Sequence, residues 1–304
     1  MFDNLTAFYE TNQRFNPAML NPQKEKVSKI TGECLPYGKL KNLHIEQKDE
    51  GILMKGSLTK YYKGNNIENL NRKDTEYAIE KLSDDIRVDC RAGRVYSLEI
   101  AVNIFLKNLY GEYLEYFGDF QNNFLKKFTI QDSIYFENKT RKIKIYNKIP
   151  ECKRKKQNIP ENIKGLGLDI MRIELTLKKR LAKEFGFPVY IKSLYDKGFY
   201  IQAVNKLIDY YSKINKITKI VMNPDKYYTP KEYFDYMLIE YIQTKGLDNI
   251  LSDIDNKRKK FNNSVQASLC KSRVKNDFEK DIVLQDKSLI YEIDDKILQL
   301  RNYR

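Results

Sequence analysis

Three stretches of this chain alternate between apolar and polar residues, and this pattern limits the fold more than any other feature. The stretches are Arg94–Phe105, Arg141–Lys148 and Met171–Arg180. Successive side chains of a β-strand point to opposite faces of a sheet, so each stretch predicts a strand with one apolar and one polar face. The apolar faces need a covering layer. We therefore expect an α+β protein, with a mainly antiparallel sheet backed by helices.

The polar faces of these strands combine a phenol, carboxylates, an amide and cations. Their expected members are Lys142, Lys144 and Tyr146, then Arg172, Glu174, Thr176 and Lys178, then Ser97, Glu99, Ala101 and Asn103. On the third strand the apolar side is expected to hold Tyr96, Leu98, Ile100, Val102 and Ile104. A carboxylate in the middle of a strand is costly to bury unless it is solvated, paired or bound to a metal. We interpret the polar face as a site for phosphodiester chemistry.

Tyr146 is the candidate nucleophile. A phenol has an ordinary pKa near ~10, so attack at neutral pH needs nearby cations that favour the phenolate. Lys144 shares its strand face and Lys148 follows two residues later. Both cations would also stabilise charge in the transition state. The alternative is a structural role, because the chain has 23 tyrosines and such residues commonly fill half-buried sheet positions.

Glu99, Glu174 and Asn103 are the candidate metal ligands. Carboxylate and amide oxygens form a hard ligand set that suits Mg²⁺ or Mn²⁺. His44 is the only histidine, so a site that holds its metal through a pair of histidines is excluded; His44 is either a third ligand or a surface residue. The alternative is that the carboxylates form ion pairs with neighbouring cations, namely Arg94, Arg172 or Lys178.

The charge of the chain predicts a polyanionic partner. Lys and Arg number 55 against 41 Asp and Glu, a net charge of +14, and the excess is concentrated in residues 139–184. Around Lys60–Asn66, cations and aromatic residues alternate before a turn, which is typical of a groove for single-stranded DNA. The candidate DNA contacts are Lys60, Lys63, Asn65, Asn66, Lys142, Lys153, Arg154, Lys155, Lys156, Arg172, Lys178, Lys179 and Arg180. The alternatives are a solvated basic face and, near Lys60, an ordinary strand end.

The chain divides into three predicted parts. Residues 1–36 are polar and interrupted by prolines, which predicts an irregular N-terminal arm. Residues 37–188 contain the alternating strands, and residues 189–304 change to a helical period, which predicts a helical, basic accessory region that binds duplex DNA. Further strands are expected at Lys39–Gln47, Gly51–Tyr61 and Asp132–Glu137, and a basic loop at Pro150–Gly167. One helix is expected to end near Ile86, and another to run from the capping box at Thr229 to Gly246. The remaining expected helices are Leu109–Phe120, Leu247–Phe261 and Ser264–Glu279.

Several functional classes lack their sequence signatures. The chain contains no GxxxxGK[ST], GxGxxG, HExxH or GxSxG motif, so NTPase, dinucleotide-binding, zincin and serine-hydrolase functions are not indicated. The four cysteines lie far apart and suggest neither a zinc knuckle nor a disulfide framework. No stretch approaches the ~18 apolar residues of a membrane span. We expect a soluble protein of the reducing cytoplasm.

Four blocks of the sequence resemble the replication initiators of filamentous phages and related plasmids, the gene II/X family. In order they are GSLTKYYKGNN, RVYSLEIAVN, SIYFENKTRKIKIYNK and MRIELTLKKRLAKEFGFP, which together span Gly51–Pro188. A looser likeness extends to the rolling-circle initiators of staphylococcal-type plasmids. Family members usually open with a short apolar strand after the initiator Met, and the opening MFDNLTAFY departs from that pattern.

The resemblance implies a rolling-circle initiator with a Rep/relaxase-like nuclease core, in which residues 37–188 form the nicking and joining domain. Such an enzyme nicks and rejoins one strand at a phage or plasmid origin through a 5′-phosphotyrosine, with Mg²⁺ or Mn²⁺. By position, Tyr146 would be the nucleophile and Glu99 and Glu174 the metal ligands, with Lys148 neutralising the bound phosphate. The implied partners are duplex and single-stranded origin DNA, host helicase and polymerase, and a second copy in a homodimer, in the cytoplasm of a bacterial host.

Two other functions fit the same sequence. A non-catalytic regulator that binds the origin would share the basic charge and the C-terminal helices. A mobilisation relaxase or a transposase would share the chemistry but not the biological role. What favours an enzyme is the expected convergence of Tyr146, Glu99 and Glu174 on one face, which a protein that only binds DNA does not need.

Overall fold

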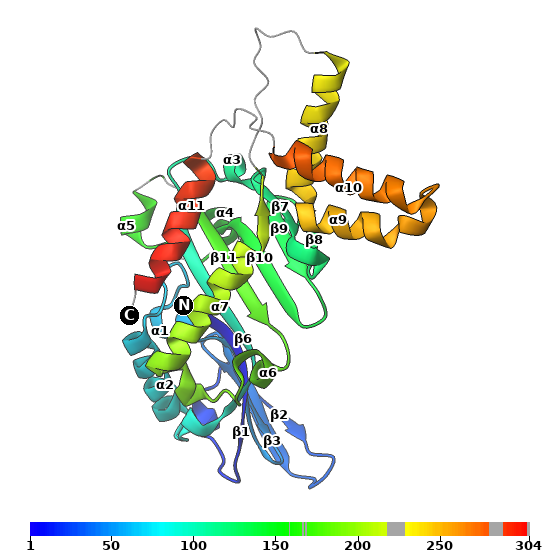
Figure 1. The fold of residues 1–304 in the computed structure, drawn as a ribbon. Coiled ribbons are helices and arrows are strands. Elements are labelled where there is room, and N and C mark those ends of the chain that lie inside the picture. The colour runs from blue at the N-terminus through cyan, green and yellow to red at the C-terminus, as the bar shows by residue number, and fades with distance from the viewer. Residues whose placement is uncertain (158, 166, 168, 218–228, 280–287, 303–304) are drawn as a thin grey trace.

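The computed structural model describes residues 1–157, 159–165, 167, 169–217, 229–279 and 288–302. Within them, ten strands form one antiparallel sheet in the order β2-β3-β4-β5-β1-β6-β11-β10-β9-β8 (Figure 1). These strands are β1 Phe2–Glu10, β2 Gln23–Val27, β3 Cys34–Leu40, β4 Leu43–Lys48, β5 Gly51–Ser57, β6 Arg94–Phe105, β8 Lys126–Ile130, β9 Ser133–Glu137, β10 Arg141–Asn147 and β11 Ile170–Leu177. A separate pair joins β7 Phe117–Phe120 to β12 Ile214–Lys216. The expected α+β fold is confirmed.

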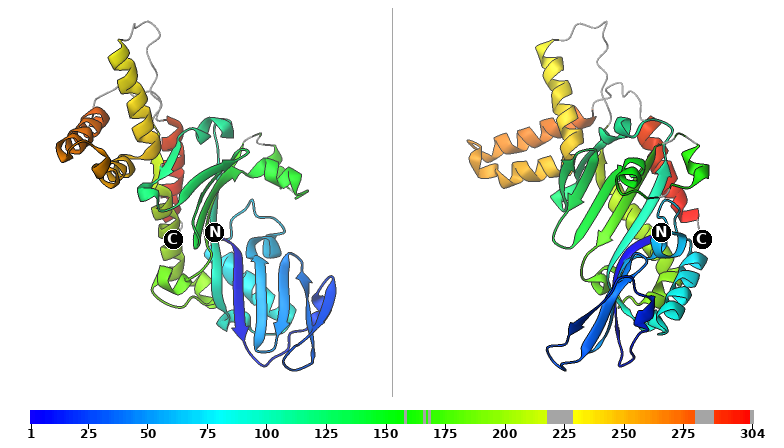
Figure 2. Two further views of the ribbon diagram at one scale, coloured as in Figure 1. Left: turned by 90° about the vertical axis from the view of Figure 1, so that its right-hand side faces the viewer. Right: turned by 180° about the vertical axis from the view of Figure 1, so that it is seen from behind.

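Several of the helices cover the apolar face of the sheet. The α-helices are α1 Leu58–Lys63, α2 Arg72–Ile86, α3 Tyr110–Leu114, α4 Lys148–Arg154, α5 Glu161–Lys164, α6 Leu181–Phe185, α7 Lys197–Ser212, α8 Pro230–Lys245, α9 Leu247–Asn256, α10 Ser264–Glu279 and α11 Ser288–Leu298. In Figure 1, α7 and α11 lie across the sheet. The view from behind turns the opposite face of β8–β11 toward the viewer, with α7 beyond it (Figure 2, right).

The registers bring the polar residues of three strands onto one face, as the alternation predicts. Tyr146 on β10 pairs with Arg172 on β11, which in turn pairs with Asn103 on β6. The next row holds Lys144, Glu174 and Ala101, and the row after it holds Lys142, Thr176 and Glu99. We call this surface, extended across β9 and β8, the polar face. On the other side Ile143, Ile173 and Ile100 are buried in the hydrophobic core.

The N-terminal segment differs most from the expectation. Residues 2–10 are not an irregular arm but form β1, which lies between β5 and β6 near the middle of the sheet. Phe2, Leu5 and Ala7 are buried and supply the apolar contacts that this position requires. Further strands at residues 23–27 and 34–40 complete that edge. The predicted boundaries at residues 36 and 188 stay a prediction, and one hydrophobic core joins residues from all three parts.

Several local expectations are corrected. The strand expected at Gly51–Tyr61 ends at Ser57, whose Oγ accepts a hydrogen bond from the Lys60 N–H and begins α1. Tyr96 is 45 % exposed rather than on the apolar side, because a register shift in the pairing of β1 with β6 turns Val95 inward instead. The loop expected at Pro150–Gly167 contains α4 and α5, and the helix expected at Leu109–Phe120 divides into α3 and β7.

The C-terminal region is helical, as predicted. Thr229 caps α8 in a reciprocal capping box with Glu232, and α8 ends at Gly246. Helices α8, α9 and α10 pack together around Ile242, Ile254 and Val274 and project away from the large sheet (Figures 1 and 2). Helix α11 was not expected from the sequence and returns to the main core. No helix among the described residues is long and apolar enough to cross a membrane.

Candidate active site

Three carboxylates from three neighbouring strands converge on the polar face. Asp3 of β1, Glu99 of β6 and Glu174 of β11 each offer an oxygen, and these oxygens lie within 4.8 Å of one another. Asp3 reaches the group because the pairing of β1 with β6 shifts register between Phe2 and Leu5. We call Asp3, Glu99 and Glu174 the acidic cluster. Sequence analysis identified Glu99 and Glu174 and missed Asp3.

The guanidinium of Arg172 lies among these carboxylates. Its Nε donates to Glu174 Oε1 at 2.6 Å, its Nη2 donates to Asp3 Oδ2, and Nη2 is 3.9 Å from Glu99 Oε1. Its Nη1 donates to the Asn66 carbonyl at 2.9 Å and to Asn103 Oδ1 at 3.1 Å. Arg172 is 1 % exposed. A direct DNA contact from this side chain, as expected from the sequence, is inconsistent with that burial.

The cluster carries more negative charge than Arg172 alone neutralises. Burial raises the pKa of Glu99 to about 7, and the neighbouring carboxylates of Glu174 and Asp3 act in the same direction. Burial also acts to raise the pKa of Asp3, but Arg172 and hydrogen bonds from Ser57 and Asn66 outweigh it, so this pKa is lowered. The Glu99 carboxyl is therefore partly protonated near neutral pH, whereas the Asp3 carboxyl stays ionised.

The residues around the cluster fit a hard divalent cation. Carboxylate oxygens are the ligands that Mg²⁺ and Mn²⁺ prefer, and three of them converge here. Asn66 donates through Nδ2 to Asp3 at 2.6 Å, while its buried Oδ1 has no hydrogen-bond partner among the described residues. A buried oxygen without a partner beside a carboxylate is what a cation or its bound water would satisfy.

Asn103 and His44 lie outside this ligand set. The Asn103 Oδ1 accepts from Arg172, and its Nδ2 donates to the carbonyls of Asn66 at 3.0 Å and Ile67 at 2.5 Å. Asn103 therefore holds the loop that contains Asn66 rather than offering a free oxygen. His44 on β4 pairs with Glu46 at 3.6 Å, which corresponds to the surface alternative.

Tyr146 is directly bonded to the cluster. Its Oη donates to Glu174 Oε1 at 2.8 Å, and only 4 % of the residue is exposed. The Lys144 Nζ lies 3.7 Å from the centre of the Tyr146 ring, so this cation contacts the ring face rather than the oxygen. Burial and Glu174 raise the pKa of Tyr146, and the opposing effect of Arg172 is smaller. The expectation that neighbouring cations lower this pKa is wrong for the isolated chain.

Lys148 is completely buried beside the tyrosine. Its Nζ lies 5.9 Å from the centre of the Tyr146 ring and donates to Glu151 Oε2 at 2.5 Å. Lys155 donates to the other oxygen of Glu151. Burial acts to raise the pKa of Glu151, but the hydrogen bonds and charges of these two lysines lower it to about 2. Lys148 is thus a fixed cation close to the phenol.

A family model that describes the N-terminal part of the phage gene II replication-associated protein matches residues 37–207, which is more than half of the chain. The chain belongs to this family. It is accordingly a replication initiator of the filamentous-phage gene II type, in agreement with the resemblance of the four sequence blocks. No curated protein matches the sequence. The matched range includes Glu99, Tyr146 and Glu174 but not Asp3.

In this gene II-family chain, residues Lys60–Asn66 do not form the open groove that was expected from the sequence. Tyr61 is buried and donates to Asp85 at 2.6 Å, and Lys63 pairs with Asp74 at 2.8 Å. Asn65 accepts from the Ile67 N–H at 3.0 Å. Lys60 is half-buried, and burial together with Lys148 lowers its pKa. These residues are engaged in contacts within the fold, and the next residue, Asn66, contacts the acidic cluster through Asp3.

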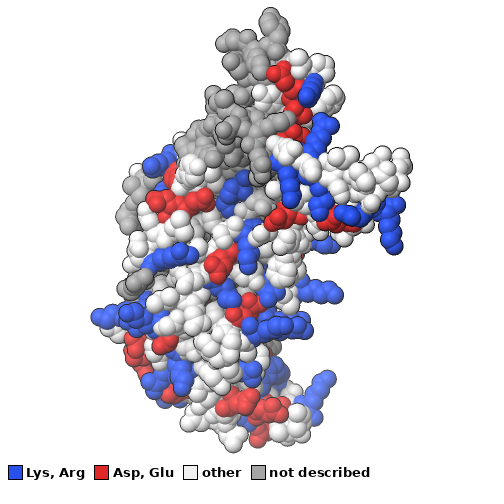
Figure 3. Space-filling model, viewed as in Figure 1, with Lys and Arg blue, Asp and Glu red and all other residues white. Residues whose placement is uncertain are grey.

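The other predicted DNA contacts of the gene II-family chain are distributed over its surface. Lys153 and Arg154 are exposed at the end of α4, Lys155 pairs with Glu151, and Lys156 follows. Lys142 and Lys178 lie on the polar face, and Lys178 pairs with Glu137. Lys179 and Arg180 are exposed beyond β11. On the opposite face, basic and acidic side chains are intermingled (Figure 3).

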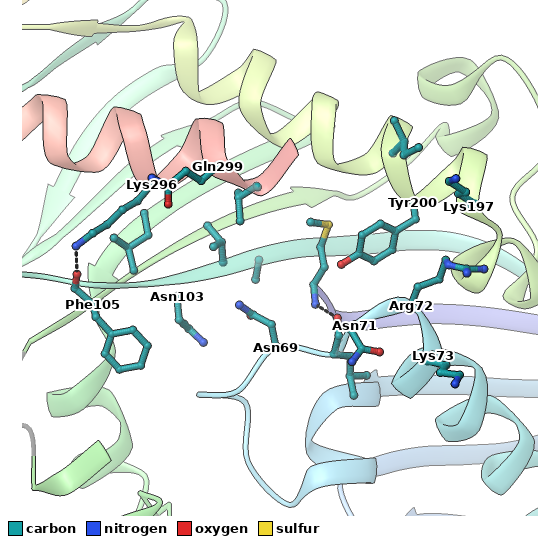
Figure 4. A pocket seen from close by; sticks show the side chains of 17 residues that line it. Asn69, Asn71, Arg72, Lys73, Asn103, Phe105, Lys197, Tyr200, Lys296 and Gln299 are labelled. Carbon is teal, nitrogen blue, oxygen red and sulfur yellow. Dashed lines mark hydrogen bonds between the residues drawn. The ribbon is translucent and has the colours of Figure 1, made fainter. Parts of the chain in front are cut away.

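A pocket of about 680 Å³ lies apart from Tyr146. It is bounded by the end of β6, the start of α2, α7, and α11 with the residues that follow it, and Lys73, Lys197 and Lys296 lie at its wall (Figure 4). Asn103 also lines it, and Lys296 donates to the Phe105 carbonyl at 2.5 Å. Its walls contain neither Tyr146 nor any member of the acidic cluster.

Proposed function

We propose that this initiator nicks and rejoins one DNA strand at a phage or plasmid origin, with Tyr146 as nucleophile and Mg²⁺ or Mn²⁺ as cofactor. The observation that carries the proposal is the 2.8 Å hydrogen bond from Tyr146 Oη to Glu174, a member of the acidic cluster. A nucleophile bonded to a base, with the base oriented by a third group, is the usual arrangement for covalent catalysis. Here Arg172 is the group that orients Glu174.

In the proposed step, the Tyr146 oxygen forms a bond to the scissile phosphorus as the bond to the 3′ oxygen breaks. The phenol proton passes to Glu174, which already accepts it in a hydrogen bond, and the 3′ oxygen takes a proton from water. A divalent ion bound by Asp3, Glu99 and Glu174 would polarise the phosphate and position it. Lys148 and Lys144 would offset the added negative charge.

The exchange conserves the energy of a phosphodiester in a phosphotyrosine, so the strand can be rejoined without ATP. The released 3′ hydroxyl would serve a host polymerase, with a helicase opening the duplex; these partners and a homodimer are predictions from the resemblance. Tyr146 is 4 % exposed. The proposal therefore requires Lys144 to move off the ring when DNA binds.

A non-catalytic origin-binding regulator is the second candidate. The observation in its favour is the complete burial of Arg172 among the carboxylates, which is what a structural ion network would show. A mobilisation relaxase or a transposase would share the first mechanism. The family match favours replication over either of these roles.

The test is a nicking assay on supercoiled plasmid that carries the origin, with Mg²⁺ or Mn²⁺. Wild type is expected to give nicked circles with protein on the 5′ end, and Tyr146→Phe is expected to bind the plasmid without nicking it. Tyr96→Phe is the matched control, because Tyr96 is a 45 % exposed tyrosine of the same sheet outside the site. Equal nicking by Tyr146→Phe and wild type would refute the nucleophile. Binding without nicking by all three proteins would favour the regulator.

A further inference from the structure

Two partly exposed aromatic side chains stack against each other on the polar face. Phe128 of β8 and Tyr135 of β9 are direct cross-strand partners, and their ring centres are 5.0 Å apart with an angle of 1° between the planes. Phe128 is 40 % exposed, and Tyr135 is partly exposed. The pair of parallel rings therefore lies at the edge of the sheet and is accessible to solvent.

This pair is in line with the proposed nucleophile. Tyr135 pairs with Lys144 across β9 and β10, and Lys144 pairs with Glu174 across β10 and β11. The Lys144 Nζ lies 5.6 Å from the ring centre of Tyr135 and 3.7 Å from that of Tyr146. One lysine therefore lies between the stacked pair and the site of the proposed reaction.

The charges around the rings suit a DNA backbone. Lys126 and Lys142 lie in the next row of the same face, on either side of Glu137, and neither side chain has a hydrogen-bond or ion-pair partner within the described part of the chain. The acid between them, Glu137, is paired with Lys178. The face that carries these residues is the one that α7 and α11 leave uncovered (Figure 2, right).

We propose that Phe128 and Tyr135 form a stacking platform for the bases of the unpaired strand next to the scissile phosphate, while Lys126, Lys142 and Lys144 contact its phosphates. The position next to a scissile phosphate rests on the proposed function, whereas stacking on the platform needs only an unpaired strand. Aromatic rings stack on any base, and proteins that bind single strands combine such rings with a basic groove. Bases in an intact duplex are already stacked, so the platform distinguishes unpaired DNA from duplex.

The competing explanation is that the rings only stabilise the β8–β9 hairpin, since aromatic cross-strand pairs contribute to sheet stability. The two explanations differ in what a truncation changes. Loss of a stabilising pair lowers the unfolding temperature and leaves the affinity of the folded protein unchanged. Loss of a platform lowers the affinity for single strands and leaves the affinity for duplex unchanged.

The experiment uses the full chain with Tyr146→Phe as the parent protein and EDTA in the buffer, so that no result depends on nicking. The probe is a mixed-sequence single strand of about 15 nucleotides with 2-aminopurine at its centre, a length within the usual site sizes. We expect the parent protein to quench the fluorescence of the probe. Phe128→Ala should quench it less and bind the probe about tenfold more weakly, a loss of about 1.4 kcal/mol of binding free energy. The affinity for the matching duplex should change by less than twofold. Tyr77→Ala, which removes a 48 % exposed ring on α2, is the control and should bind like the parent.

A second variant separates folding from binding. Phe128→Leu keeps apolar bulk in the hairpin but has no π face, and thermal unfolding monitored by circular dichroism reports its stability. Single-strand binding by Phe128→Leu equal to that of the parent would refute the platform, as would an equal loss of duplex and single-strand affinity. If wild type failed to nick while the quenching difference persisted, the platform would stand and the catalytic proposal would fall.

Discussion

Glu99→Gln tests the electrostatics of the acidic cluster. Glu99 has a folded-state pKa of about 7 because burial, Glu174 and Asp3 disfavour its charge, whereas its ordinary value is 4.5. The charged groups that face it are Asp3, Glu174 and Arg172. Asn4 donates to Glu99 Oε1 at 2.9 Å, and the Thr176 hydroxyl donates to Oε2 at 3.4 Å. Glutamine keeps the shape of the side chain and removes the charge.

The sign of the pH dependence follows from the two pKa values. Below about pH 4.5 the carboxyl is protonated in both states, and above about pH 7 it is ionised in both, so the penalty for burying the charge grows between these limits. The shift corresponds to roughly 3 kcal/mol when fully developed. In EDTA, wild type should therefore lose stability from this group as pH rises from 4.5 to 7, and Glu99→Gln should not.

The assay is urea unfolding of both proteins at pH 5, 6, 7 and 8. The free energy of unfolding of Glu99→Gln is expected to exceed that of wild type by about 2–3 kcal/mol at pH 8 and to approach it near pH 5. Glu161→Gln is the control, because the side chain of Glu161 is 86 % exposed. A difference between wild type and Glu99→Gln that stays constant from pH 5 to pH 8 would refute the account.

Two further predictions concern the neighbours of Glu99. Asp3→Asn should weaken Mn²⁺ binding by about tenfold or more in isothermal titration, because it removes one of three converging carboxylates; unchanged affinity would place the ion elsewhere. Arg172→Met should destabilise the fold by about 3–5 kcal/mol in urea at neutral pH, because it leaves buried carboxylates without their cation, and a loss below about 1 kcal/mol would show that the pairing is not structural.

The alternating strands could be predicted because their pattern is local. The bounds of β6, the hairpin of β9 and β10 and the polar side of β11 follow from period-two alternation, and this alternation is sufficient to predict that Tyr146, Glu99 and Glu174 share one face. The capping box at Thr229 is equally local. These signals need no knowledge of distant contacts.

The parts that could not be predicted depend on contacts between distant residues. Asn66 was interpreted as a turn residue free to meet DNA, but it is buried and bonds Asp3, 63 residues away in the sequence. Arg172 follows the polar alternation, and the sequence does not show that this side chain is enclosed by β1 and the Asn66 loop. Burial of the phenol and the negative charge of Glu174, to which it donates, raise the pKa of Tyr146 and so reverse the expected direction of its shift.

Asp3 is the functional candidate for which the sequence carries only a partial signal. In MFDNLTAFY, Phe2, Leu5 and Ala7 are apolar, and polar residues lie between them, but the register shift after Phe2 breaks strict alternation and hides the strand. The stacked pair of Phe128 and Tyr135 was also missed. Only the pairing of β8 with β9 brings these residues together.

The central claim is that Tyr146 becomes covalently joined to DNA, and peptide mapping of the trapped complex tests it most directly. An origin single strand with a short segment upstream of the nick site, which leaves with a 3′ hydroxyl on nicking, would be incubated with wild type and Mn²⁺. The product would be digested with protease and nuclease and analysed by mass spectrometry. The account predicts a 5′-phosphonucleotide on the peptide that contains Tyr146. A modified peptide with another tyrosine, or nicked DNA with a free 5′ phosphate and no adduct, would contradict it.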